Sequence, residues 1–368
     1  MIGALTLAFA VALLGAASFL RPSWVRVVGA LLLAAPPVLL VSERWLGVLV
    51  GAGAAALAFR FLPIRVLRRV VFLVPSLVLL VFVTTALMYA APGSPFAQER
   101  VAAPQVEEAL RAQYGVPRSA IEFFGVYMER LVVEGSLGPS LKVQGRSVGE
   151  LLAPALPVSL SLGLLALTLA VGGGLVLGIA AGVWPRSWID HTSMGLALVG
   201  ISLPNFVIGA GLLIVFALGL GWLPVAGWGT PGHLVLPAVT LAAPYAAYVA
   251  RLARAGMLET MQQDFVRTAR AKGLPERVVV LDHALRGAVL PVVSFLGPAA
   301  AGILTGSFVV ETLYGVPGMG QWFVKGAINR DYSVVLGTAL FYASLVGVLN
   351  LGVDLLYAWI DPRVREQL

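Results

Sequence analysis

The stretch LETMQQDFVRTARAKGLPERVVVLDHALRGAVLP, residues 258 to 291, is a polar segment between two long apolar stretches. Apolar runs of about 18 or more residues are long enough to cross a bilayer as helix, whereas a polar, helix-forming segment favours water. The pattern therefore predicts a chain that crosses a membrane and returns this segment to the aqueous side. We expect the basic stretch before Gly273 and Pro275 to meet a partner protein.

Composition fixes the class of protein. The chain is 59% hydrophobic and 12% charged, with a mean hydropathy of +0.92, so its polar groups cannot cover its apolar surface in water. Short alternating strands typical of a membrane barrel are not seen, which predicts an all-α integral membrane protein. The sequence contains no cysteine, so neither disulfides nor thiolate metal sites contribute.

Hydropathy predicts six spans in the body of the chain, at residues 70–91, 155–183, 190–219, 235–256, 289–312 and 334–359. An N-terminal extension, residues 1–63, precedes the main domain, residues 64–368. Its apolar stretches at 2–20, 25–41 and 45–62 predict about three extra transmembrane helices, hence nine spans. Two alternatives are a cleaved signal peptide at residues 1–19, which lacks a basic n-region, and a re-entrant hairpin at Pro36 and Pro37.

Basic residues in short loops orient these spans. All but three of the 25 Lys and Arg residues are arginines in loops and helix ends, so the net charge of +7 reflects a positive-inside bias and predicts no nucleic-acid partner. Arginines before residue 70 place that end in the cytoplasm. Alternation then puts residues 92–154 outside and the loop 258–288 inside. Seven basic against four acidic residues in 251–286 agree with this, as do six against seven in 92–154.

The outer segment, residues 92–154, is predicted to form a small helical cap. VEEALRAQYG and IEFFGVYMERLVVEG each carry apolar residues at helical spacing, and Gly115 and Gly135 are predicted to end the two helices. A solvated loop is the alternative. At some 60 residues the segment exceeds an ordinary connection, which favours an interaction role.

The cytoplasmic loop is predicted to contain a short amphipathic helix. From Gln262 to Lys272 no residue breaks a helix, and Gly273 is expected to end it. Asp264 lies in the first turn and Arg270 in the last, as the helix dipole prefers. One predicted face consists of Phe265, Thr268, Ala269 and Lys272. Such a helix can dock into a groove of a soluble partner, and the alternative is a helix on lipid headgroups.

Catalytic and metal-binding patterns are not found. Only Lys142, Lys272 and Lys325 exist, and none lies in a Walker A loop, so ATP is not expected to bind by that route. The histidines show no metal-ligand spacing, and no G-x-S-x-G elbow occurs. We therefore predict no catalytic residue, no metal ligand and no cofactor on this chain.

A few residues within the spans are candidates for a translocation pathway or for helix bends. Glu311 and Asp354 would serve a proton-coupled carrier, although hydrogen bonding to neighbours near the two interfaces is the favoured reading. Pro204, followed by Asn205, and also Pro244 and Pro298 are expected to interrupt spans. The glycines at 172–174 are expected to permit close helix approach.

The run DFVRTARAKGL (264–274), followed by HALRGAVLP (283–291), resembles the coupling loop of ABC-importer permeases of the dipeptide, oligopeptide and nickel class, their form of the EAA loop. Where the EAA pattern has its acidic residue this chain has Arg267, and Asp264 is the nearest carboxylate. Further similar motifs span residues 65 to 366: RRVVFLVPSLVLLVFVTTALMYAAPGSP, GSLGPSL, LPVSLSLGLLAL, ISLPNFVIGAGLLIVFALGLGWLPVAGW, HLVLPAVTLA, VVETLYGVPGMGQ and LLYAWIDPRVR.

The resemblance implies a six-helix permease core in a bacterial or archaeal plasma (inner) membrane. Its implied partners are a second homologous permease, two ABC ATPase subunits that would bind ATP and Mg, and an extracytoplasmic solute-binding protein. The residues implied to couple to the ATPase are Asp264, Arg267, Thr268, Ala269, Arg270, Ala271, Lys272 and Gly273.

Three function classes follow. A permease subunit of an ATP-driven importer explains the cytoplasmic loop, the outer cap and the missing ATP site. An ion-coupled carrier would use Glu311 and Asp354 but gives the loop no purpose. A membrane scaffold would carry out no transport, and an intramembrane enzyme would need a catalytic pair that is not found. Short peptides rank first as cargo, ahead of nickel chelates and sugars, and the sequence leaves open whether the two permeases are identical.

Overall fold

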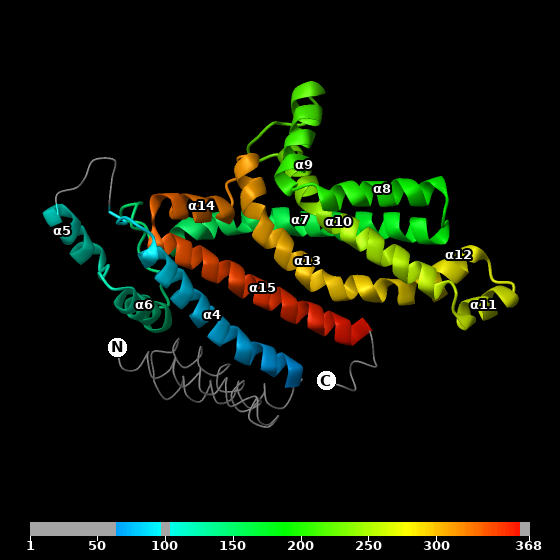
Figure 1. Ribbon diagram of the computed structural model, residues 1–368, viewed down its shortest axis with the longest axis horizontal. Helices are drawn as coiled ribbons and strands as arrows, with labels where there is room; N and C mark the ends of the chain where they lie inside the picture. The colour runs from blue at the N-terminus through cyan, green and yellow to red at the C-terminus, as the bar shows by residue number, and fades with distance from the viewer. Residues whose placement is uncertain (1–63, 97–103, 361–368) are drawn as a thin grey trace. The chain divides into compact units, whose positions relative to one another are not determined.

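The computed structural model describes residues 64–96 and 104–360, and the predictions for residues 1–63 lie outside this part of the chain. Within the described ranges every regular element is a helix and no strand is formed, which confirms the all-α class. The chain divides into two compact units. Figure 1 colours the chain by residue number, from blue at the N-terminus to red at the C-terminus. Unit 1 is Met1–Ala153 with Trp322–Leu368, and unit 2 is Pro154–Gln321.

Six stretches of helix match the six spans expected for the body of the chain, with ends that differ by several residues. Five are single helices of sufficient length and hydropathy, and the sixth is a bent pair. They are Val71–Ala90, Val148–Val183, Trp188–Ser202 with Asn205–Gly219, Pro231–Thr260, Glu276–Leu304 and Tyr332–Gly352.

The span expected at 190–219 is a bent pair, broken at the proline that was expected to interrupt it. Helices α8 (Trp188–Ser202) and α9 (Asn205–Leu212), the latter continued by η2 (Leu213–Gly219), diverge by 114°. Pro204 has no N–H to donate and disfavours helical backbone at the residue before it, and Leu203 is extended, with φ −96 and ψ 136. The proline therefore ends one helix and begins another, and Figure 1 shows α9 steeply inclined to α8.

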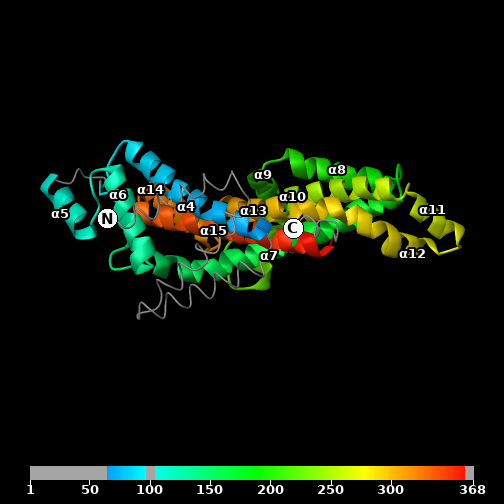
Figure 2. The ribbon, with the colours of Figure 1, turned by 90° about the horizontal axis from the view of Figure 1, so that it is seen from below.

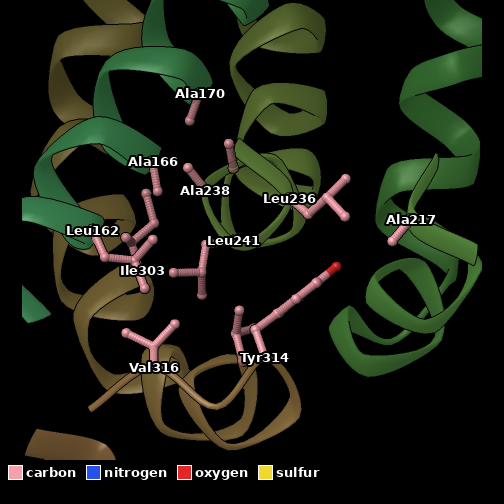
Figure 3. Packing of buried hydrophobic residues seen from close by; sticks show 12 residues of the cluster. Leu162, Ala166, Ala170, Ala217, Leu236, Ala238, Leu241, Ile303, Tyr314 and Val316 are labelled. Carbon is pink, nitrogen blue, oxygen red and sulfur yellow. The ribbon is translucent and has the colours of Figure 1, made fainter. Parts of the chain in front are cut away.

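The core of unit 2 lies between α7 (Val148–Val183), whose first residues belong to unit 1, α10 (Pro231–Thr260) and α13 (Leu285–Leu313). Figure 3 shows Leu162 and Ala166 of α7 opposite Leu241 of α10 and Ile303 of α13. All four side chains are buried. The hydroxyl of Tyr314 points toward α9, where it donates to the carbonyl of Gly209 at 3.0 Å. This bond holds the second half of the bent pair to the core.

Close approach of α7 to α10 depends on glycines, although only in part on those predicted. A side chain at Gly174 would meet Val249, and one at Gly178 or Gly182 would meet Ala253 or Met257. Gly172 and Gly173 face open space instead. The predicted small-residue contact is therefore confirmed for Gly174 alone, and it continues at every fourth residue toward the end of α7.

Loops predicted on the same side of the membrane lie together within unit 2. At one end, the last turns of α7 pack with α10, α11 (Asp264–Ala271) and η3 (Val279–Ala284) in one apolar cluster. At the other end, the N–H of Gly227 donates to the carbonyl of Tyr314 at 2.9 Å. This arrangement agrees with the alternation of spans predicted from charge.

Unit 1 packs α4 (Ile64–Ala90) along α15 (Tyr332–Ile360), as Figure 2 also shows. The outer segment forms α5 (Pro104–Tyr114), α6 (Ala120–Glu129) and η1 (Arg130–Glu134). Gly115 and Gly135 end these helices with φ of 61° and 64°. The predicted helical cap is thus confirmed; α14 (Met319–Asn329) leads from one unit into the other.

Aromatic side chains and one buried carboxylate hold the cap. Phe123 and Tyr127 of α6 are buried with Phe96 and with Tyr332 of α15. Asp331, which is 2% exposed, accepts hydrogen bonds from the hydroxyl of Ser140 and from the N–H groups of residues 141 and 142, at 2.5, 3.0 and 3.2 Å. It also accepts from the N–H of Val334 and thereby caps α15. The cap is therefore fixed to α15 by directed bonds as well as by apolar packing.

Candidate functional site

The candidate site is helix α11, residues Asp264–Ala271, in the loop predicted to be cytoplasmic, and its ends form as the sequence predicts. Gln263 is extended and precedes the first turn. At the other end the N–H of Gly273 donates to Arg270 at 2.9 Å, and the N–H of Leu274 donates to Ala269 at 3.3 Å. This pair of bonds is a Schellman motif, which requires the left-handed backbone that Gly273 adopts at φ 76°. The predicted helix and its glycine stop are confirmed.

The buried face of α11 is not the face that was predicted. Val266 is fully buried and Ala269 is 4% exposed. Both pack against Met257 of α10, Val279 and Val280 of η3 and two alanines of the following chain, Ala284 and Ala288. The assignment of Ala269 to an outward face is therefore wrong, because the three-residue step from Val266 makes these two side chains one inward stripe.

The outward face of α11 is mixed in character. Phe265 is 49% exposed, and Asp264, Arg267, Thr268, Ala271 and Lys272 are also exposed. Arg267 lies 3.4 Å from Asp264, a contact between two largely solvated groups. A half-exposed aromatic ring surrounded by both signs of charge is suited to contact with a folded partner.

A charge pair joins α11 to the segment that follows it. The guanidinium of Arg270 donates to both carboxylate oxygens of Glu276, at 2.7 and 3.2 Å. This fork bridges the turn at Gly273 and raises the pKa of Arg270, so Arg270 stays cationic. Of the residues implied to couple to an ATPase, Arg270 therefore supports the turn. Ala269, with Val266, packs in the inner apolar cluster, which we call the seat of α11. The other side chains face outward.

Glu311, a predicted pathway residue, lies at the end of α13 in a tightly built polar contact. Its carboxylate accepts from the hydroxyl of Ser159 at 2.6 Å and from the N–H of Gly320 at 2.8 Å. The same hydroxyl accepts from the N–H of Met319 at 2.8 Å. A side chain at Gly318 or Gly320 would run into the carboxylate. Glu311 therefore caps the start of α14, in agreement with the prediction that it is hydrogen-bonded to its neighbours.

The remaining predicted residues have different surroundings. Pro204 and Asn205 mark the break between α8 and α9. Pro244 and Pro298 lie inside α10 and α13, which continue through them, so the expectation that these two prolines interrupt a span is wrong. Asp354 lies in α15, in a stretch whose side chains the structure does not describe. In the part of the chain that is described, no group of three or more His, Asp or Glu side chains gathers as a metal site.

A partly buried ion pair between α8 and α10 was not among the predicted residues. Asp190 of α8 and Arg254 of α10 form two hydrogen bonds, at 2.6 and 2.8 Å. They are 64 positions apart, so no local pattern pairs them. The sequence offers only a weaker signal: each residue is a charge at the predicted cytoplasmic end of a span, where opposite charges are expected to pair.

Comparison with known proteins identifies relatives over most of the chain. The family "Binding-protein-dependent transport system inner membrane component" matches residues 174–366. The oligopeptide transport system permease protein OppB of Escherichia coli (strain K12) is 44% identical over 302 residues, 82% of this chain and 98% of that protein. The dipeptide transport system permease protein DppB of Bacillus subtilis (strain 168) is 40% identical over 290 residues, 79% of this chain and 94% of that protein.

Among solved structures, the crystal structure of an amino acid ABC transporter with histidines aligns with a TM-score of 0.42 at 21% identity. The alignment covers 58% of this chain and 94% of the other.

Proposed function

The chain belongs to the binding-protein-dependent transport system inner-membrane components, the permeases of ABC transporters, and from this premise we propose that it imports short peptides and is driven through α11. In this proposal it lines half of a translocation pathway in the inner membrane. A second permease subunit lines the other half, and an extracytoplasmic binding protein delivers the cargo.

The proposed cargo rests on the relatives. The proteins similar over four-fifths of this chain are named as oligopeptide and dipeptide permeases. Among the described residues of the spans, buried charges are engaged with the protein itself, as Glu311 is with Ser159 and Gly320. A cargo released by a binding protein needs only loose contact in the pathway, so dedicated charged ligands within the spans are not required.

One observation carries the proposed drive: α11 is seated on the permease by two small apolar side chains and presents the rest of its surface outward. Val266 and Ala269 fix the helix to the ends of α10 and α13. A force applied to Phe265 and its charged neighbours is therefore delivered to two long helices at once. The chain has no Walker A lysine, so we propose that ATP hydrolysis and its Mg²⁺ belong to two partner ATPase subunits bound at this face.

The change Phe265→Glu tests this assignment. It places a charge on the exposed ring position without touching the seat, and we expect at least about tenfold weaker association of the ATPase subunits that co-purify with the wild-type chain. Uptake of a labelled tripeptide should fall with it, while membrane insertion stays normal.

The matched control is Ile121→Glu, the same kind of change at a residue of α6 that is 73% exposed. It should leave ATPase association unchanged. Wild-type association and uptake in Phe265→Glu would contradict the proposed role of α11.

A further inference from the structure

The turn between α7 and α8 is bound to α10 by a single carboxylate. Asp190, whose side chain is 5% exposed, receives Nε of Arg254 on one oxygen and Nη2 on the other. The second oxygen also accepts the N–H of Arg186 at 2.9 Å. Arg186 has a left-handed backbone, with φ of 61°, which is unfavourable for a residue with a side chain. Asp190 thus stabilises the turn and attaches it to α10.

Arg254 is attached to the part of α10 that carries the seat of α11. Met257, one helical turn further on, is fully buried against Val266 and Ala269 of α11. Gly182 of α7 lies against the same turn, where a side chain would meet Met257 and the carbonyl of Arg254. Any displacement of α11 that moves Met257 therefore moves Arg254 with it.

Another contact between α8 and α10 is made by small groups. Further along, Gly200 of α8 rests on Ala243 and Ala247 of α10. Contacts between small apolar groups are non-directional and tolerate sliding, whereas a two-pronged guanidinium–carboxylate contact has one geometry. Of these contacts, only the ion pair makes α8 follow α10 along its axis.

We propose that Asp190 and Arg254 are positioning residues for transport, which transmit the displacement of the coupling helix from α10 to α8. Beyond α8 the chain breaks at Pro204 and turns by 114° into α9. Movement of α8 then changes the inclination of α9 without deforming a continuous helix. The inference rests on the proposed role of α11 and adds the route by which its motion reaches the bent pair.

The test uses the full transporter, with its ATPase subunits and binding protein, reconstituted in vesicles and supplied with a tripeptide that the wild type takes up. Asp190→Asn and Arg254→Gln should assemble and hydrolyse ATP, yet carry about tenfold less tripeptide per ATP hydrolysed, a typical size for coupling between two sites. An unchanged ratio of uptake to hydrolysis would overturn the proposal, and this includes equal losses of both, because a purely structural role lowers both together.

The matched control is Glu108→Gln. Glu108 pairs with Arg118 at 2.7 Å, but both side chains are largely exposed, at 69% and 78%. This variant should keep the wild-type ratio. If the Asp190 and Arg254 variants do not accumulate, Arg254→Lys is measured, since it keeps the charge and loses the fork. In Arg254→Lys the tripeptide carried per ATP hydrolysed should fall at least about twofold, which is less than in the other two variants. A wild-type value would overturn the proposal.

A second measurement follows the motion itself. The chain has no cysteine, so Ile214→Cys on η2, at a position 61% exposed, accepts one fluorescent label. ATP should change its emission in the otherwise wild-type transporter and not in the Asp190→Asn background. The Phe265→Glu variant separates the two claims. If it transports normally the coupling role of α11 fails, whereas if it uncouples and Asp190→Asn does not, only the present inference fails.

Discussion

The segment around α11 and the cap around α6 are both helical segments between spans, but they are held in different ways. α11 is seated by two small side chains, Val266 and Ala269, and its charged groups lie outside. The cap is built on large aromatic rings, and its key charged group, Asp331, is buried among N–H donors. The first arrangement suits a helix that is pushed by a partner, and the second suits a cover that keeps its shape.

Asp331→Ala should give the largest loss of stability, because it leaves the buried N–H of Leu141 and the buried hydroxyl of Ser140 without this acceptor and uncaps α15. We expect unfolding of the purified chain in mild detergent to become easier by about 3 kcal/mol. Asp331→Asn retains an acceptor oxygen and should lose less. A stability equal to wild type in Asp331→Ala would show that the cap is held by its aromatic rings alone.

Ala269→Glu should have a smaller effect, confined to the segment around α11. A buried carboxylate is unfavourable in the apolar seat, but α11 is short and can leave it, so the loss is limited to local opening, about 2 kcal/mol. Hydrogen exchange across residues 262–274 measures it. Ala271→Glu, two positions on and exposed, should exchange at nearly the wild-type rate. Equal exchange in both variants would refute the inward orientation of Ala269.

Gly273→Ala and Gly135→Ala should have the smallest effects, and together they compare α11 directly with the cap. Both glycines have positive φ, and neither has an atom within 4 Å of an added methyl group, so each change costs only backbone strain of about 1 kcal/mol. Gly273→Ala should weaken ATPase association in a pull-down, whereas Gly135→Ala should lower only the stability of the cap. Weakened association in both would mean that the two regions are not independent.

Local features of this chain are readable from sequence, whereas contacts between distant residues are not. Apolar runs predict the spans, and the Gly273 stop predicts the end of α11, because each depends on neighbouring residues. Asp331 could have been found as a helix N-cap before Tyr332, but its bonds to residues 140–142 could not. The same is true of Asp190 with Arg254. The size of the bend at Pro204 and the inward turn of Ala269 likewise depend on what the rest of unit 2 places beside them.

The polar contact at the end of α13 has a consequence for how this sequence can change. Glu311 fills the space that side chains at 318 and 320 would need, and its carboxylate accepts the N–H of Gly320. A shorter residue at 311 leaves a void, and a larger one at 318 or 320 displaces the carboxylate. Replacing Glu311 would relieve only part of the constraint on the two glycines, because a side chain at Gly318 would still meet Ser159 and one at Gly320 would still meet the backbone of Phe308.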